Sequence, residues 1–238
     1  MTTLVKIIVA TIVSLSLFSC NFNYGVKGNG HVTVENRPIN KPFTAINASE
    51  GLDVYLTQSD DASISVEADD NLQELIITEV IDNVLKIHTK ENIGSCTSKK
   101  IIVSFKDVTS ITATSGSDVK STNTFIIKDL NLETTSGSDM NLDVNTVSLN
   151  CKSTSGSDLI LSGKTIKLIA EATSGSAIEA ADLIAESSQV TATSGADITV
   201  NTSKELTANA TSGADIKYLG NPEVVNKSDS SSGSIKKQ

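Results

Sequence analysis

The sequence predicts an all-β fold, a single-stranded right-handed parallel β-helix with coils of about 20 residues that is less regular toward its N-terminal end. Three observations support this prediction. A Thr-Ser-Gly phrase recurs at nearly even spacing, apolar and polar residues alternate on both sides of it, and the repeat is too short to contain a crossover helix. Such a chain buries its core coil by coil.

The repeated phrase sets the period of the fold. It reads Thr-Ser-Gly-Ser-Asp in three copies, and the later copies carry one alanine in place of the second serine or the aspartate. Its glycines lie 18 to 21 residues apart, and a weaker copy at Gly233 follows the last of them. They are Gly116, Gly137, Gly156, Gly175, Gly195 and Gly213. Because glycine adopts positive φ without a Cβ clash, each is predicted to form a corner between two strands.

Two columns of the repeat are predicted to form the core. The third residue after each glycine is apolar in every copy: Val119, Met140, Leu159, Ile178, Ile198 and Ile216. The fifth residue before each glycine is also apolar: Ile111, Leu132, Cys151, Ala170, Val190 and Ala208. Polar residues stand beside these positions, which is the alternation of a half-buried strand.

Two other folds have to be weighed against the β-helix. Leucine-rich repeats share the period, but their Leu-x-x-Leu-x-Leu pattern and asparagine ladder are absent from this chain. A meander of hairpins in a sandwich stays open as an alternative, although hairpins do not require the same corner residues at every twentieth position.

The first residues predict export and a lipid anchor. Residues 1–19 form a predicted lipoprotein signal peptide, with Lys6 followed by an apolar run too short to span a bilayer. Leu17-Phe18-Ser19-Cys20 resembles the lipobox of bacterial lipoproteins, which makes Cys20 the expected lipid attachment site and the membrane a partner through that anchor. Ordinary signal cleavage nearby is the alternative. Residues 20–30 are expected to be a tether to the domain over residues 31–238.

The irregular part precedes the repeat. Short strands are expected at residues 31–35, 52–56, 85–87 and 101–105. Gly51-Leu52-Asp53 imitates the later corners, and Gly51 lies 65 residues before Gly116. That separation is about three periods, so residues 43–110 are expected to form the opening coils of the same solenoid. Residues 228–238 are expected to cap one end.

Charge excludes some partners. The chain has a formal net charge of −9, and loss of residues 1–19 removes one lysine, which leaves 18 basic against 28 acidic residues and a net charge of −10. Nucleic acid is therefore not an expected partner, because binding it requires Lys and Arg at the phosphates. Arg37 is the only arginine, so bidentate clamps on phosphate or carboxylate are not expected either.

The cysteines and histidines indicate neither a metal site nor a cofactor. Cys151 falls in an inward column and is interpreted as a small core residue, whereas Cys96 lies in an irregular stretch. Whether the two form a disulfide is left open. With two histidines and no Cys or His cluster, the expected metal and cofactor content is none.

Several segments resemble a known family. They are Phe43-Thr44-Ala45-Ile46, Gly51-Leu52-Asp53-Val54-Tyr55-Leu56, Val66-Glu67-Ala68-Asp69-Asp70-Asn71-Leu72, Leu85-Lys86-Ile87 and the later Ser-Gly-Ser-Asp coils. Together they resemble the head GIN domain family, whose members carry the provisional label of auto-transporter adhesins. The resemblance covers roughly residues 31–236. It implies a β-helical, secreted or lipid-anchored envelope protein, and it offers no catalytic residues.

One polar column is the candidate ligand site. The second residue after the glycine is aspartate in five of six copies: Asp118, Asp139, Asp158, Asp197 and Asp215. Stacked coils would place these carboxylates about 4.8 Å apart, where two charges repel by about 0.9 kcal/mol in water. The column is either a row of solvated corner residues or a stack that faces a ligand or cations such as Ca²⁺.

These features predict a non-catalytic envelope lipoprotein with an adhesin-like binding surface or a scaffold role. Its expected partner is an envelope or extracellular glycan or protein, its expected place is the outer membrane, and self-association through the solenoid ends is expected. A β-helix polysaccharide lyase or glycosidase is the alternative function. A catalytic site would break the repeat with distinctive acids, bases and sugar-stacking rings, and the chain has no tryptophan and three tyrosines.

Overall fold

The computed structural model describes residues 25–230 and 232–238. The predicted signal peptide and the predicted lipid attachment site, Cys20, lie outside these residues. The described chain forms one sheet of 17 strands and a 3₁₀ turn at Asp70–Leu72. The strands are β1 (Val32–Arg37), β2 (Ala45–Ala48), β3 (Asp53–Gln58), β4 (Ser63–Asp69), β5 (Ile76–Ile81), β6 (Val84–Thr89), β7 (Lys99–Phe105), β8 (Ser110–Ala113), β9 (Asp118–Ser121), β10 (Phe125–Thr135), β11 (Asp139–Thr154), β12 (Asp158–Thr173), β13 (Ala177–Thr193), β14 (Asp197–Thr211), β15 (Asp215–Leu219), β16 (Val224–Asp229) and β17 (Ser234–Lys237).

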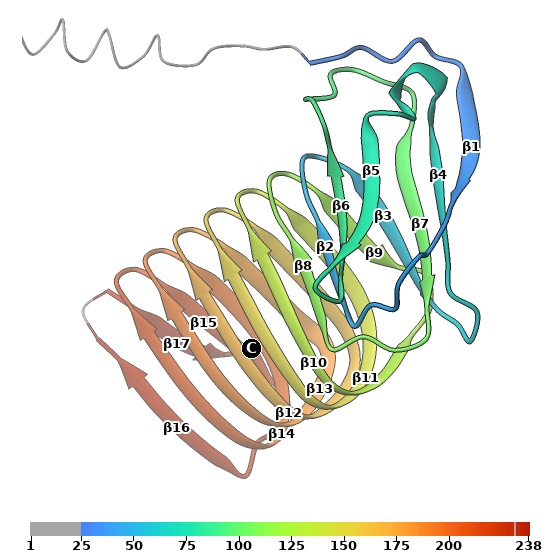
Figure 1. The fold of residues 1–238 in the computed structure, drawn as a ribbon. Coiled ribbons are helices and arrows are strands. Elements are labelled where there is room, and N and C mark those ends of the chain that lie inside the picture. The colour runs from blue at the N-terminus through green and yellow to red at the C-terminus, as the bar shows by residue number, and fades with distance from the viewer. Residues whose placement is uncertain (1–24, 231) are drawn as a thin grey trace, which may run out of the picture.

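The repeat region is the predicted β-solenoid. Strands β10 to β14 each bend once and pair in parallel with the next strand, so the coils lie over one another along one axis (Figure 1). The column that begins at Val119 and ends at Ile216 is in register from coil to coil, and its six members are at most 1% exposed. The column from Ile111 to Ala208 is buried as well. Both core predictions are confirmed, and the sandwich alternative is wrong.

Each corner uses two residues in the left-handed region, whereas the sequence pattern pointed only to glycine. Ser155 and Gly156 have φ of 58° and 66°, and all six copies share this pair of positive values. In the first copy the Ser117 N–H donates to the Thr114 carbonyl at 3.3 Å. Positive φ at two central positions closed by this bond is the arrangement of a type I′ turn. A Cβ on any of these six glycines would meet nothing within 4 Å, so the glycine is required by φ rather than by space.

A buried serine ties the corners of successive coils together. The Ser138 hydroxyl donates to the Ala113 carbonyl of the preceding coil at 2.8 Å and accepts from the Thr135 N–H at 3.1 Å. Ser117 and Ser176 make the equivalent pair of bonds. Alanine fills this position in the last two copies, where the side chain is again fully buried. Only a small residue fits here, because the corner turns tightly around it.

The opening coils do not follow chain order, contrary to the prediction of three successive coils between Gly51 and Gly116. Strands β2 and β3 pair in parallel with β8 and β9 on one side and with β6 and β7 on the other. The Gly51 N–H donates to the Ser115 carbonyl at 3.0 Å, which is the bond that Gly116 makes to Ser136. The coil of residues 45–58 is thus inserted between the coil of residues 84–105 and the coil of residues 110–121.

Antiparallel strands close the N-terminal end. Strand β4 pairs with β7, β1 pairs with β4, and β5 pairs with β6, all antiparallel. Residues 25–30, which the sequence places in the tether, belong to this cap. Val26 bridges to Ile93, and the Gly30 N–H donates to the buried Asp69 carboxylate at 2.7 Å.

Asp69 is the centre of this cap. Its carboxylate also accepts the N–H groups of Thr97 and Ser98, each at 3.0 Å. The bond from Gly30, opposed by burial and supported by the other N–H groups, holds the pKa of Asp69 below its ordinary value.

Because the pKa of Asp69 is lowered in the folded state, the stability of the fold is expected to depend on pH. A depressed folded-state pKa stabilises the fold above the unfolded value of about 3.9, and the contribution is lost as the pH falls through the folded value. We therefore expect Asp69→Asn to lower the melting temperature at pH 7 and to flatten its decline between pH 5 and pH 2. Melting curves of both proteins across this range measure the effect. Asp129→Asn, at an exposed position, is the control, and parallel profiles for Asp69→Asn and the parent would contradict the assignment.

The last coil continues the solenoid. The prediction that residues 228–238 fold over its end as a cap is therefore wrong. Strands β16 and β17 pair in parallel with β14 and β15. In register, Lys227 and Asp229 occupy the inward columns of Ala208 and Ala210, and Lys237 that of Tyr218. The Lys227 ammonium lies 4.6 Å from the centre of the Tyr218 ring. Three of the inward columns therefore end in charged side chains, whereas the columns of Leu206 and Ile216 end in Val225 and Ile235.

Candidate binding surfaces

The corners form a polar ridge along the solenoid. We use the name corner ridge for the outward Thr, Ser and Asp side chains of six corners, at residues 114–118, 135–139, 154–158, 173–177, 193–197 and 211–215. The threonines of neighbouring coils approach closely, and the Thr173 and Thr193 hydroxyls are 2.9 Å apart. The serines that follow these threonines are exposed, because their positive φ turns them out of the coil. The ridge thus presents rows of identical groups.

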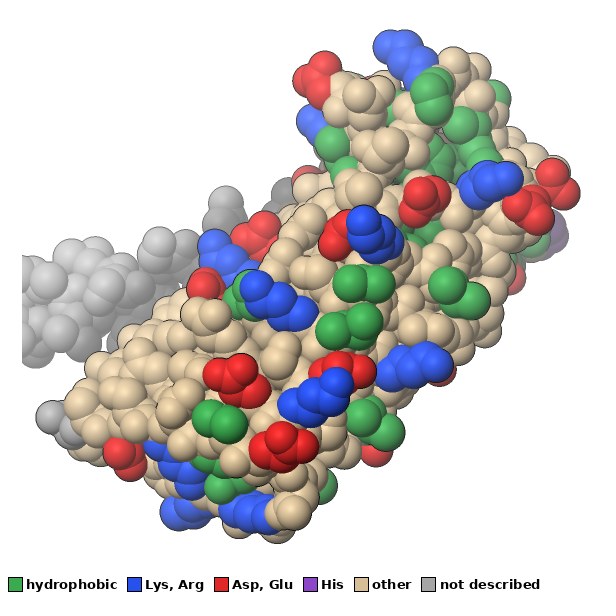
Figure 2. All heavy atoms as spheres, turned by 90° about the horizontal axis from the view of Figure 1, so that it is seen from below, with side chains coloured by type: hydrophobic (Ala, Val, Ile, Leu, Met, Phe, Trp, Pro, Cys, Tyr) green, Lys and Arg blue, Asp and Glu red, His purple; other side chains and the backbone are tan. Residues whose placement is uncertain are grey.

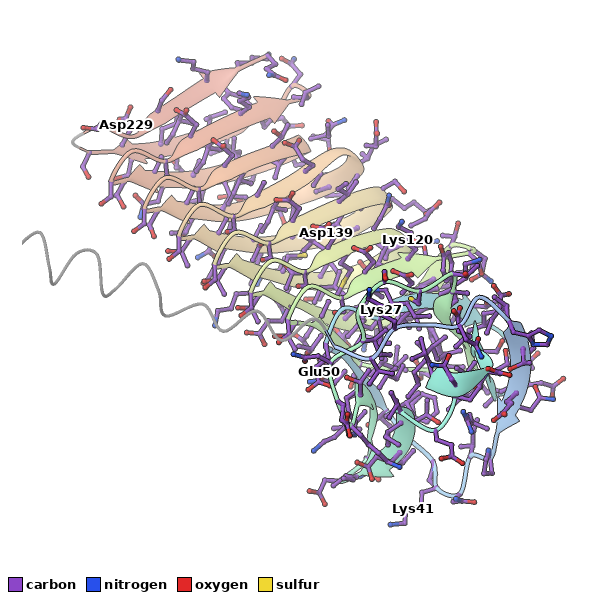
Figure 3. The ribbon with its side chains drawn as sticks, turned by 90° about the horizontal axis from the view of Figure 1, so that it is seen from above. Lys27, Lys41, Glu50, Lys120, Asp139 and Asp229 are labelled. Carbon is purple, nitrogen blue, oxygen red and sulfur yellow. The ribbon has the colours of Figure 1, made fainter. Side chains whose placement is uncertain are left out.

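The structure brings all five predicted aspartates into one row. Asp118, Asp139 and Asp158 are direct partners in register, Ala177 interrupts the row, and Asp197 and Asp215 continue it. Asp53 extends the row at the N-terminal side, opposite Asp118. The sequence pattern of Gly51-Leu52-Asp53 could have identified this sixth member. Figure 3 labels Asp139 on the outer side of the coils.

Partial burial and the neighbouring carboxylates raise the pKa of two aspartates in this row. Partial burial, and then the charges of Asp118 and Asp158, raise the pKa of Asp139 above its ordinary value. Burial is also the main cause that raises the pKa of Asp53. Among residues 25–230 and 232–238, no three His, Cys, Asp or Glu side chains come together closely enough to hold a metal ion. Asp139, Asp158, Asp197 and Asp215 are exposed to solvent, and a ligand or cation on this row stays a prediction.

A second surface, which sequence reasoning missed, lies at the bend in the middle of the long strands. We call it the apolar strip, formed by Ile126, Val147, Ile166 and Ile184, whose side chains are 69%, 44%, 48% and 58% exposed. It lines a shallow groove of about 610 Å³ with Lys128, Lys164 and Glu186 at its margins. Figure 2, the view from below, shows hydrophobic side chains exposed among basic and acidic ones on this side of the molecule. Adjacent apolar pairs such as Ile126-Ile127, which break the alternation, were the available signal.

A polar hollow lies where the ridge meets the N-terminal cap. It has a volume of about 510 Å³ and is lined in part by Glu50, Glu79, His88 and Ser115. His88 Nε2 lies 3.1 Å from Glu79 Oε1. Glu50 is occupied structurally, because its carboxylate accepts the Thr89 N–H at 2.7 Å and the Thr89 hydroxyl at 2.9 Å. No hydrogen bond in the described chain joins His88 to a serine, so the hollow does not form a nucleophilic triad.

The two cysteines within the described residues are free thiols. Cys151 is buried in its predicted core column, and burial raises the pKa of its thiol. Cys96 is half-buried beside the cap, where burial also raises the pKa. The structure thus shows no disulfide between them, and neither thiol has the lowered pKa of a reactive cysteine.

The chain matches one protein family. The family described as "Putative auto-transporter adhesin, head GIN domain" matches residues 42–222, which is most of the chain. This chain belongs to the head GIN domain family. The membership agrees with the resemblance carried by the opening strands and the Ser-Gly-Ser-Asp coils. No curated protein sequence matches this chain.

Solved structures of other bacterial proteins show the same fold. A structure described as a putative adhesin from Bacteroides fragilis is 22% identical, with a TM-score of 0.83 over 90% of this chain and 100% of the other. One described as a putative lipid binding protein from Parabacteroides distasonis is 21% identical, with a TM-score of 0.74 over 90% and 99%. A putative adhesin from Parabacteroides merdae is 18% identical, with a TM-score of 0.70 over 90% and 98%. At these identities the likeness concerns the fold.

Proposed function

We propose that this head GIN domain protein is a non-catalytic lipoprotein of the cell envelope, anchored through Cys20 to the outer membrane, which binds a glycan or protein ligand on its corner ridge. One observation carries the proposal: six consecutive coils present the same hydroxyl groups, and five present the same carboxylate, outward and in register. The charge of the row disfavours anionic ligands and favours neutral or cationic ones.

The envelope location is supported by family membership and by the predicted signal peptide and lipobox. No helix in the described part of the chain has the length and apolar character to cross a bilayer. Protease treatment of intact cells tests the orientation of the protein. Release of the domain by the protease would support adhesion, whereas protection would support a scaffold role on the periplasmic side.

A binding experiment tests the ridge. A glycan array and envelope-protein pull-down with the parent protein identify a ligand, and Asp158→Lys is expected to weaken its binding at least tenfold, because this position is exposed at the centre of the row. Asp129→Lys, exposed but outside the ridge, is the matched control and is expected to bind like the parent. If both variants bind the ligand as tightly as the parent protein does, the ligand binds to another surface and the ridge proposal is wrong. Release of reducing sugar from a bound glycan would establish the lyase or glycosidase alternative.

A further inference from the structure

The apolar strip belongs to two rows of outward side chains that run along the solenoid over four coils. In one row Ile126, Asn145, Lys164 and Ile184 are direct partners in register. The other row lies two residues further along each coil and consists of Lys128, Val147, Ile166 and Glu186, each flanked by residues that are paired in register. We call these the Ile126 row and the Lys128 row. The residues between them, such as Thr146 and Thr165, are buried.

Each row is complementary to itself when its direction is reversed. Read backwards, the Ile126 row sets isoleucine against isoleucine and Asn145 against Lys164. The reversed Lys128 row sets Val147 against Ile166, and Lys128 against Glu186. We propose that this face is the interface of an isologous dimer, in which a second copy of the chain packs on it with its solenoid axis antiparallel. The two-fold axis then lies in the interface, between the second and third of these coils.

The reversed arrangement satisfies every position of the two rows. The contacts Ile126–Ile184 and Val147–Ile166 each form twice, once on either side of the two-fold axis. The Lys128–Glu186 ion pair also forms twice. The columns that flank the rows bring no like charges together: Asp129 meets Ser187, and Asp143 meets Ser162. Glu186 also pairs with Lys204 of its own chain at 2.5 Å, which holds its carboxylate at the edge of the groove.

A parallel copy does not fit the same face. With both solenoids pointing the same way, each residue of the Ile126 row meets the residue of the Lys128 row from the same coil. Ile126 would then face Lys128, Lys164 would face Ile166, and Ile184 would face Glu186. Every apolar side chain would be buried against a polar or charged one, which costs desolvation without a compensating contact.

An extended peptide is also a poor occupant. Alternate side chains along a strand are roughly 6.6 Å apart, whereas successive coils are about 4.8 Å apart, so its side chains fall out of step with the strip. The solenoid ends do not compete as dimer contacts, because antiparallel strands cover one end and Lys227, Asp229 and Lys237 occupy three of the inward columns at the other. The self-association expected at the ends is thus assigned to the side of the solenoid.

The size of the face determines the strength of the dimer. Three coil spacings of about 4.8 Å give a strip roughly 14 Å long. A face of this length buries less surface than a protein–protein interface of standard size. We therefore expect a weak dimer, with a dissociation constant on the order of 10 µM or above. Confinement of anchored copies to one membrane raises their effective concentration and favours the dimer.

Cysteine cross-linking in cells that express the full chain tests this arrangement. In a Cys96→Ser background, Ile126→Cys combined with Ile184→Cys is expected to give disulfide-linked dimers on addition of an oxidant, because position 126 of one copy meets position 184 of the other. Ile126→Cys alone is expected to give none, since its counterpart lies roughly 14 Å away, beyond disulfide reach. Equal cross-linking of the single variant, or none with the double variant, would overturn the proposal.

Charge exchange in the same cross-linking background is the second arm. Lys128→Glu and Glu186→Lys are each expected to reduce the cross-linked fraction at least fivefold. Their combination, made together with Lys204→Glu so that position 186 keeps a neighbour of opposite charge, is expected to restore it. All three positions are on the surface, so these substitutions are expected to leave the stability of the fold nearly unchanged. Failure of the combined variant to recover would overturn the ion pair and the register. If no dimer forms and a polarity-sensitive dye at Ile166→Cys reports burial in vesicles of anionic phospholipid, the occupant is lipid and the proposal is wrong.

Discussion

Replacing Gly163 by alanine is expected to destabilise the solenoid by roughly 3–6 kcal/mol, as the sum of backbone strain and overpacking. Gly163 has φ of +104°, and a Cβ there would lie 2.1 Å from the Val144 carbonyl oxygen of the preceding coil. That oxygen belongs to the backbone of a neighbouring strand, so it cannot move aside as a flexible side chain would. Urea unfolding followed by far-ultraviolet circular dichroism measures the change.

Gly156→Ala provides the matched control for this prediction. Gly156 has φ of +66°, but a Cβ there meets nothing within 4 Å. Only the left-handed conformation is penalised, at about 1–2 kcal/mol. The two substitutions therefore separate close approach from backbone conformation at two glycines of the same coil. A loss of equal size at both positions would show that the contact with Val144 does not account for the need for glycine at residue 163.

Removing the charges from the last coil is expected to turn a closed end into an adhesive one. In the triple variant Lys227→Val, Asp229→Val and Lys237→Val, the inward columns of Ala208, Ala210 and Tyr218 would continue into apolar side chains at an unpaired strand edge. Two such ends are expected to join tail to tail. The product stops at a dimer because the N-terminal end is covered by antiparallel strands. Sedimentation at micromolar concentration measures the change of mass.

This experiment needs two controls. Lys128→Glu is included in all proteins, so that association through the apolar strip does not contribute. Lys217→Val replaces an outward lysine on the preceding coil and tests whether loss of positive charge alone causes association. The triple variant is expected to be dimeric and the Lys217→Val protein monomeric. A monomeric triple variant would show that the three charged side chains are not what keeps this end of the solenoid apart from others.

The periodic part of the fold could be predicted because each copy repeats the same physical requirement. A residue such as Leu159 must be apolar to enter the core, and Gly156 must take a positive φ, so both leave a mark at every period. The other left-handed residue of each corner, Ser155 in this copy, also repeats at every period, but serine does not by itself indicate a positive φ, since it is common at exposed polar positions. The order of the opening coils could not be read either. Gly51-Leu52-Asp53 identifies a coil, but alternation is the same whichever neighbour the strand chooses.

The same contrast explains the candidate sites. The row of Asp118, Asp139 and Asp158 was visible because it repeats in step with the glycines. The apolar strip was not, because its members alternate between two rows and share their coil positions with Asn145 and Lys164. Its complementarity exists only between coils in three dimensions. A search of the sequence for repeated residue types does not find a surface that is formed by different residue types at equivalent positions.

The inserted coil of residues 45–58 constrains how the molecule comes into being. Both of its neighbours, at residues 84–105 and 110–121, are synthesised after it, so it has no parallel partner when it first appears. It must wait for about 60 more residues, whereas each later coil finds a finished surface already present. Residues 110–121 close over this coil and at the same time offer the template for the regular array. Assembly is therefore expected to begin in the interior of the chain and to spread toward both ends.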